Sequence, residues 1–190
     1  LNAVVPPVFM NSLHVYDRFE DYCNVDVYKD DQFVYGRSSN PTVHILERKI
    51  AELEHGSRAV AFSSGMAACT AAIMATCKAG SHIVSSSSIY GGTYNLIAVT
   101  MKKMGVDVTF VNPDCTDEEL NAAFKDNTKA VFGESIANPA LTVLDIEKFA
   151  KATHAHGVPL IVDNTFPTPI NLRPIEWGAD IITHSTTKYM

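Results

Sequence analysis

Several residues in this sequence, most of them polar or titratable, follow short apolar segments that are typical of β-strands. They are Ser64, Gly65, Met66, Tyr90, Asp163, Ser185, Thr187 and Lys188. In an open parallel sheet the carboxyl ends of the strands meet at one edge, and ligands bind at that edge. We therefore expect these residues to surround one site for a small molecule.

One part of this set suits a phosphate group. The segment Ser64-Gly65-Met66 opens a predicted helix, so its backbone N–H groups lie at the positive end of the helix dipole. Gly65 has no side chain to keep an anion away, and the hydroxyl groups of Ser185 and Thr187 could add donors. The pattern predicts a phosphate subsite at the start of this helix.

The remaining residues suit an aldehyde carried on a flat heterocycle. The amine of Lys188 could form a Schiff base with an aldehyde, and Asp163 could hold a ring nitrogen protonated. Tyr90 could stack on the ring. Taken singly these are weak signals, because an aspartate at a strand end more often caps a helix and a lone lysine is more often a surface charge. Together, phosphate, aldehyde, ring nitrogen and flat ring describe pyridoxal phosphate.

The elements that must position these residues alternate along the chain. Six apolar segments are predicted as strands, at 59–62, 82–85, 106–111, 129–133, 160–162 and 181–183. Helices are predicted at 41–55, 66–77, 93–104, 117–125 and 146–156, with a loop at Gly91-Gly92. This alternation predicts an α/β fold, a mostly parallel sheet with helices on both faces. Residues 1–40 are predicted to be an irregular arm, and residues 41–190 the α/β domain.

Composition excludes several classes of protein. The chain has 190 residues, a net charge of −6 and no basic block, so we expect no nucleic-acid partner. Its longest apolar run, from Ala71 to Ala75, is too short for a membrane span. The four cysteines form no Cys-x-x-Cys pair, which favours free thiols in the cytoplasm. The seven histidines show no ligand spacing, so we expect no metal.

Eight motifs, in this order and at this spacing, resemble the Cys/Met-metabolism family of fold-type I pyridoxal-phosphate enzymes. The motifs are Tyr35-Gly36-Arg37, Asn40-Pro41-Thr42, Ser63 to Ala68, Tyr90 to Thr93, Glu134 to Pro139, Val162 to Phe166, Gly178-Ala179-Asp180 and Ser185 to Tyr189. They extend from Tyr35 to the end, so the resemblance covers nearly the whole chain.

The resemblance implies a role for each matched residue. Catalytic roles fall to Lys188, which would carry the cofactor, to Asp163, which would pair with its ring nitrogen, and to Tyr90, which would stack on the ring and help to move protons. Phosphate and ring contacts would come from Ser64, Gly65, Met66, Ser185, Thr187 and, near the ring oxygen, Asn138. Tyr35 and Arg37 would reach the phosphate in a neighbouring subunit, so residues 1–40 would be an arm or loop that contacts a partner subunit. This implies a homo-oligomer, a dimer with shared sites and in the family a tetramer.

The resemblance also implies a type of reaction and the length of a complete family member. Tyr90 to Leu96 is most similar to O-acetylhomoserine sulfhydrylases, whereas methionine γ-lyases usually carry a cysteine at the position of Gly92. We expect replacement of the γ-substituent of an O-acylated homoserine by sulfide or a thiol. Family members continue beyond the lysine into a C-terminal domain that carries the arginine for the substrate carboxylate, so we expect this chain to be truncated before that domain.

Three alternatives stay open at this point. The first is a γ-lyase or a cystathionine synthase or lyase of the same family. The second is a nucleotide-binding module of Rossmann type, although Ser63 to Ala68 lacks the pattern Gly-x-Gly-x-x-Gly. The third is a non-catalytic subunit with a vestigial site, against which the presence of Lys188, Asp163 and Tyr90 argues.

Overall fold

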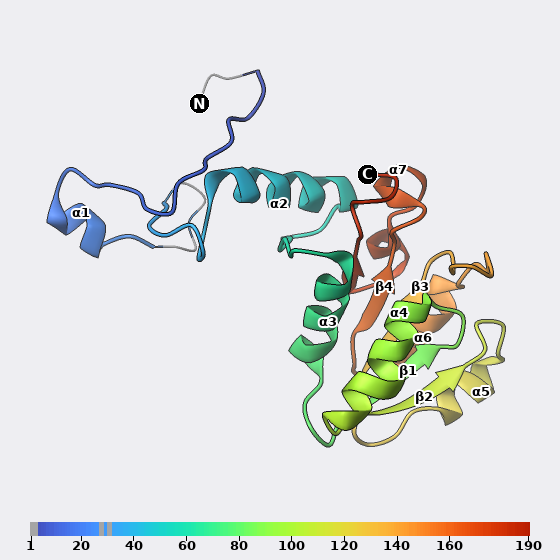
Figure 1. The fold of residues 1–190 in the computed structure, drawn as a ribbon. Helices are drawn as coiled ribbons and strands as arrows, with labels where there is room; N and C mark the ends of the chain where they lie inside the picture. Colours follow the sequence, from blue (N-terminus) through green and yellow to red (C-terminus); the bar gives the residue numbers. More distant parts are fainter. Residues whose placement is uncertain (1–3, 27–28, 30–31) are drawn as a thin grey trace. The chain divides into compact units, whose positions relative to one another are not determined.

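The computed structural model describes residues 4–26, 29 and 32–190 (Figure 1). The chain divides into two compact units, Leu1–Ala61 and Phe62–Met190. The site residues predicted from the strand ends all belong to the second unit, whereas Tyr35 and Arg37 belong to the first. None of the helices formed by the described residues is long and apolar enough to cross a bilayer.

The second unit is built on a parallel sheet of five strands. The strands are β1 (His82–Ser86), β2 (Asp107–Val111), β3 (Thr128–Glu134), β4 (Leu160–Asp163) and β5 (Ile181–Thr183), in the order β2-β1-β3-β4-β5. The chain moves outward from β1 to β2 and then crosses back to β3. This reversal leaves a crevice at the carboxyl ends of β1 and β3, where α/β proteins commonly bind ligands.

Helices connect the strands of the second unit. They are α3 (Gly65–Thr76), α4 (Gly91–Asn95) continued by the π-helix η1 (Leu96–Met101), α5 (Asp117–Ala122), α6 (Ile146–Ala155), α7 (Thr168–Asn171) and the 3₁₀ turn η2 (Pro174–Trp177). Three of them begin as the sequence predicts, because the side chains of Ser64, Thr116 and Asp145 accept hydrogen bonds from the first-turn backbone. Thr116 and Glu119 form the reciprocal capping box.

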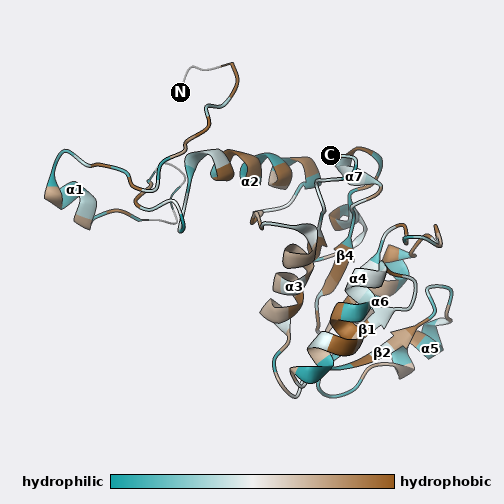
Figure 2. Ribbon diagram, in the orientation of Figure 1, coloured by the Kyte–Doolittle hydropathy of each residue, from teal (hydrophilic) through white to brown (hydrophobic). Residues whose placement is uncertain are grey.

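Helices cover both faces of the sheet. Phe132 of β3 packs in a buried cluster with residues of α3 and η1, while its neighbour Val131 packs in a second cluster with residues of α5 and α6. Strand β4 is accordingly a run of buried apolar residues up to Asp163 (Figure 2). The predicted parallel sheet with helices on both faces is confirmed.

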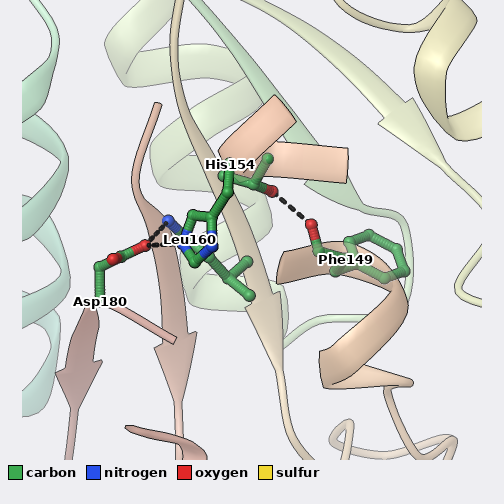
Figure 3. A network of polar contacts seen from close by, with 5 residues as sticks. Phe149, His154, Leu160 and Asp180 are labelled. Atoms are coloured by element: carbon green, nitrogen blue, oxygen red, sulfur yellow. Dashed lines mark hydrogen bonds and ion pairs between the residues drawn. The ribbon is translucent and has the colours of Figure 1, made fainter. Parts of the chain in front are cut away.

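A polar network fastens α6 to the edge of the sheet opposite the predicted site. One carboxylate oxygen of Asp180, Oδ2, accepts the backbone N–H of Leu160 at 2.8 Å and lies 3.0 Å from Nε2 of His154 (Figure 3). Leu160 begins β4, and Asp180 directly precedes β5. This network fixes the amino ends of both strands, and their carboxyl ends carry the predicted site residues.

The first unit contains the helices α1 (Phe19–Cys23) and α2 (Pro41–Glu54). The side chain of Asn40 accepts hydrogen bonds from the first turn of α2, as its position before Pro41 predicts. The prediction that residues 1–40 are irregular is wrong for α1, a single helical turn whose residues are all exposed. Part of that predicted arm, residues 1–3, 27–28 and 30–31, lies outside the described residues.

Three other boundary predictions need correction. Residues 59–62 form no strand, because the Ala61 N–H donates at 2.8 Å to the Glu47 carboxylate instead of to a strand partner. Gly91-Gly92 is not a loop, since α4 begins at Gly91. Helix α5 ends at Ala122 and not near Lys125, because the N–H of Lys125 donates to the side chain of Thr128 and the chain turns into β3.

Candidate active site

A pocket of about 260 Å³ lies at the carboxyl ends of the strands in the second unit. Nine of the residues that the sequence predicts for the site line it: Ser64, Gly65, Met66, Tyr90, Asn138, Asp163, Ser185, Thr187 and Lys188. They come from the start of α3, from the end of β4 and from the segments that follow β1, β3 and β5. The fold therefore brings together groups that are more than a hundred residues apart in the sequence.

The amino end of α3 presents unpaired backbone donors to this pocket. The first N–H groups of a helix have no carbonyl of their own helix to bind. Ser64 uses its Oγ to accept the N–H of Ala67 at 3.1 Å and its carbonyl to accept the N–H of Ala68 at 3.1 Å. No described residue accepts a hydrogen bond from the N–H groups of Gly65 and Met66, so these donors are open to a ligand, and the helix dipole there favours an anion.

Two hydroxyl groups lie beside these donors because Gly65 allows a close approach. A Cβ at position 65 would lie 2.6 Å from the Cβ of Ser185, which is closer than two carbon atoms can pack. The Oγ of Ser185 is 3.0 Å from Oγ1 of Thr187. A glycine at this position is therefore required for Ser185 and Thr187 to share the anion subsite with the start of α3.

Asp163 is held in place at the carboxyl end of β4. Its Oδ1 accepts the backbone N–H of Thr165 at 3.0 Å and also the hydroxyl of Thr165. Its Oδ2 lies 3.5 Å from the sulfur of Cys69, which comes from α3. The hydroxyl oxygen of Thr165 in turn accepts the N–H of Ser185 at 2.9 Å. Thr165 thus couples the position of the carboxylate to the anion subsite.

The thiol of Cys69 is buried behind Asp163. Burial, followed by the negative charge of Asp163, raises the pKa of Cys69 to about 12. The sulfur therefore keeps its proton at neutral pH. It lies 3.5 Å from Oδ2 of Asp163 and 3.5 Å from Oγ1 of Thr183, so it can donate to either oxygen.

The ring of Tyr90 lies over the first turn of α4. A Cβ at position 92 would clash with Cε1 of this ring, so Gly92 is the residue that makes room for it. Tyr90 is 46% exposed, and its ring lines the pocket. An aromatic face is therefore available to a flat ligand.

Glu134 is a buried carboxylate between two of the predicted ligand contacts. Its Oε1 accepts the backbone N–H of Tyr90 at 2.7 Å, and its Oε2 accepts the backbone N–H of Asn138 at 3.0 Å. Burial, and to a smaller extent the nearby Asp163, raises the pKa of Glu134 to about 7 against the effect of these two donors. The carboxyl group is thus buried with both of its oxygens hydrogen-bonded.

Lys188 follows β5 in an exposed turn. Its backbone N–H donates to the carbonyl of Ser185 at 3.3 Å, and its side chain lines the pocket. An amine is therefore present in the same cavity as the anion subsite and Asp163.

Two predicted site residues, Tyr35 and Arg37, belong to the first unit. The guanidinium carbon of Arg37 lies 5.1 Å from the centroid of the Tyr35 ring, which places the cation over the aromatic face. Tyr35 also forms an isolated antiparallel bridge with Leu13. Their predicted role, contact with a neighbouring subunit's phosphate, stays a prediction.

Sequence reasoning missed several residues of the pocket. Cys69, Thr165 and Glu134 all line it, yet none was given a role from the sequence. Glu134 and Thr165 could have been suspected, since each lies at or just after the carboxyl end of a predicted strand. Cys69 gave no signal of its own, because an apolar, alanine-rich helix accommodates a buried cysteine without any function.

The donor set fits pyridoxal phosphate. Two helix N–H groups and two hydroxyls suit its phosphate, and the carboxylate of Asp163 suits a protonated ring nitrogen. The face of Tyr90 suits its ring, and the amine of Lys188 suits its aldehyde. Ser185 approaches Gly65 so closely that a side chain at position 65 would not fit, and this contact sets the shape of the anion subsite.

Comparisons with known proteins agree with this chemistry. The model of the family described as Cys/Met metabolism PLP-dependent enzyme matches residues 1–190. O-acetyl-L-homoserine sulfhydrylase of Corynebacterium glutamicum is 47% identical over 96% of this chain and 42% of its own length. L-methionine gamma-lyase of Fusobacterium nucleatum subsp. polymorphum is 40% identical over 97% of this chain and 47% of its own length.

Solved structures show the same fold. A Campylobacter jejuni protein, solved with N′-pyridoxyl-lysine-5′-monophosphate, matches 98% of this chain and 46% of its own chain at a TM-score of 0.90 and 33% identity. The chain described here thus spans less than half the length of these relatives. The match of the family model to the whole chain, and these identities, lead to one conclusion: the chain belongs to the Cys/Met metabolism family of PLP-dependent enzymes.

Proposed function

We propose that the protein replaces the γ-substituent of an O-acylated homoserine with sulfide or a thiol, giving homocysteine or a similar amino acid. One observation carries this proposal: a single pocket is lined by Lys188, Asp163, Tyr90 and the amino end of α3. The relative from Corynebacterium glutamicum, named O-acetyl-L-homoserine sulfhydrylase, supports this choice of reaction. The small amino acid and the sulfide or thiol are the proposed partners.

The residues of the pocket divide into those that hold the cofactor and those that act on the substrate. The N–H groups of Gly65 and Met66, with the hydroxyls of Ser185 and Thr187, would bind the phosphate. Asp163 would keep the ring nitrogen protonated, which is the state in which pyridoxal phosphate withdraws electrons from a bound amino acid. Ser64 would support this subsite through its cap on α3.

The acting groups are Lys188, Tyr90 and Asn138. The Nζ of Lys188 would hold the cofactor's aldehyde, and after release it would take the proton from the α-carbon of the amino acid. The ring of Tyr90 would stack on the cofactor, and its hydroxyl would help to move protons. Asn138 would lie near the ring oxygen.

A γ-lyase is the second candidate, because L-methionine gamma-lyase of Fusobacterium nucleatum is 40% identical. The two reactions are separated by an assay of the intact protein with pyridoxal phosphate and O-acetylhomoserine, with and without sulfide. Our proposal predicts homocysteine that depends on sulfide. Ammonia and a 2-oxo acid formed at the same rate without sulfide would instead identify a lyase.

We propose that Tyr35 and Arg37 contact the phosphate held by a second copy of the chain, so that the active protein is a dimer with shared sites or a tetramer. Mixing equal amounts of Arg37→Ala and Lys188→Ala should then restore about a quarter of the wild-type activity. About half of the dimers are then mixed, and one of the two shared sites in each mixed dimer keeps both residues. The four free cysteines support the cytoplasm as its compartment.

A further inference from the structure

Glu134 connects two segments of the pocket that would otherwise be independent. The segment of Tyr90 follows β1, and the segment of Asn138 follows β3, so each leaves the sheet at a different strand. Each donates a backbone N–H to one oxygen of the Glu134 carboxylate, at 2.7 Å and 3.0 Å. This carboxylate is the bridge between the two segments at the point where the chain order reverses.

The bridge is rigid because of where Glu134 lies. It is the last residue of β3, it is paired in register with Asp163 of β4, and it is only 5% exposed. Hydrogen bonds to a charged acceptor are stronger than those between neutral groups. A small shift in the position of this carboxylate would therefore move the Tyr90 segment and the Asn138 segment together. Each segment presents a side chain to the pocket.

The groups around Glu134 favour neither charge state strongly. Burial and the negative charge of Asp163 from β4 disfavour the carboxylate, whereas the two N–H donors favour it. The neutral thiol of Cys69, from α3, lines the same cavity. The amine of Lys188, after β5, and the phenol of Tyr90, before α4, line the same cavity. Because burial raises the pKa of Glu134 to about 7, the bridge exists in both forms near neutral pH.

We propose that Glu134 is a positioning residue that sets the distance between the Tyr90 and Asn138 segments, and so fixes the orientation of the cofactor ring. The inference rests on the proposed function, because it assumes that a ring binds between these segments. Glu134 itself need not touch the reacting atoms. Loss of the Glu134 carboxylate would let the cofactor ring change its orientation, while all the groups predicted to hold the phosphate would remain.

The variant Glu134→Gln tests this in the intact protein. Glutamine has the same shape but accepts through one oxygen only, and its amide donors would face one of the backbone N–H groups. The matched control is Glu119→Gln, since Glu119 also accepts a backbone N–H, from Thr116 at 2.9 Å, at the first turn of α5 and away from the pocket. Far-UV circular dichroism shows whether each variant is folded.

Two measurements report on the ring itself. Titration of the cofactor-free protein with pyridoxal phosphate should give a dissociation constant about tenfold higher for Glu134→Gln, because one charge-assisted hydrogen bond is lost. The visible circular dichroism of the bound cofactor, which depends on ring orientation, should fall in the same variant. As the pH drops below about 7 this signal should also fall in the wild type, and it should stay constant in Glu134→Gln. The control should match the wild type.

A double-mutant cycle separates positioning from general loosening of the fold. If Glu134 acts through Tyr90, the effect of Glu134→Gln on cofactor affinity should shrink in a Tyr90→Ala background. Equal effects in both backgrounds, or unchanged affinity and dichroism in Glu134→Gln, would overturn the inference. A wild-type protein that takes up no pyridoxal phosphate would overturn the proposed function, and the inference with it.

Discussion

The stability of the protein should depend on pH through Glu134. The pKa of its carboxyl group is raised from 4.5 to about 7, chiefly because burial disfavours the charged form. The folded protein therefore holds this proton more tightly than the unfolded chain does. The contribution of Glu134 to stability is fully present below a pH of about 4.5 and is lost as the pH rises through about 7.

The magnitude follows from the two pKa values. Between about pH 5 and pH 8 the proton linkage of this one group amounts to about 2.5 kcal/mol. Glutamine at this position cannot titrate, so Glu134→Gln removes the linkage while most of the packing stays. The free energy of unfolding of the wild type, minus that of the variant, should thus be lower at about pH 8 than at about pH 5 by this amount.

The assay is urea unfolding of both proteins at the two pH values, followed by circular dichroism. Other titrating groups are the same in the two proteins, so their effects cancel in the difference. A difference that does not change with pH would show that Glu134 titrates in the folded protein as it does in the unfolded chain. That result would refute the argument from burial.

Three further changes test single contacts. Gly65→Ala should weaken binding of pyridoxal phosphate, measured by titration, and lower the free energy of unfolding by about 1–3 kcal/mol through overpacking, measured by urea unfolding. The control Gly91→Ala should change neither quantity, because a Cβ at position 91 meets open space. Alkylation with iodoacetamide, mapped by mass spectrometry, should modify the exposed Cys23 but not Cys69, which is buried with a pKa of about 12; modification of both at equal rates would contradict this. Asp180→Ala should lower the free energy of unfolding by about 1–3 kcal/mol, because a buried backbone donor loses its acceptor, and an unchanged urea midpoint would count against it.

The sequence predicted the sheet well because most of its strands are buried on both faces. β4, for example, is a short run of apolar residues, and that pattern is typical of a parallel strand between two layers of helices. The segment 59–62 has a similar composition but pairs with no strand, and its Ala61 N–H bonds to a side chain of α2. Composition alone cannot distinguish the two cases, because strand formation depends on a partner.

The site was predictable to the extent that it depends on topology. Asp163 and Lys188 follow apolar segments, and a parallel sheet necessarily collects such residues at one edge. The role of Glu134 was not predictable, since it depends on which backbone N–H groups its two oxygens reach. The start of α4 at Gly91 was missed for a related reason: Gly92 makes room for the Tyr90 ring within a helical turn, whereas paired glycines usually indicate a loop.

The central claim is that one pocket combines a phosphate subsite with the amine of Lys188. The direct test is to add pyridoxal phosphate to the intact protein, reduce with borohydride, digest, and map the added mass. We expect an adduct on the peptide that contains Lys188, and none at that site in Lys188→Ala. An adduct on a different lysine only, or a folded wild-type protein with no adduct at all, would contradict it.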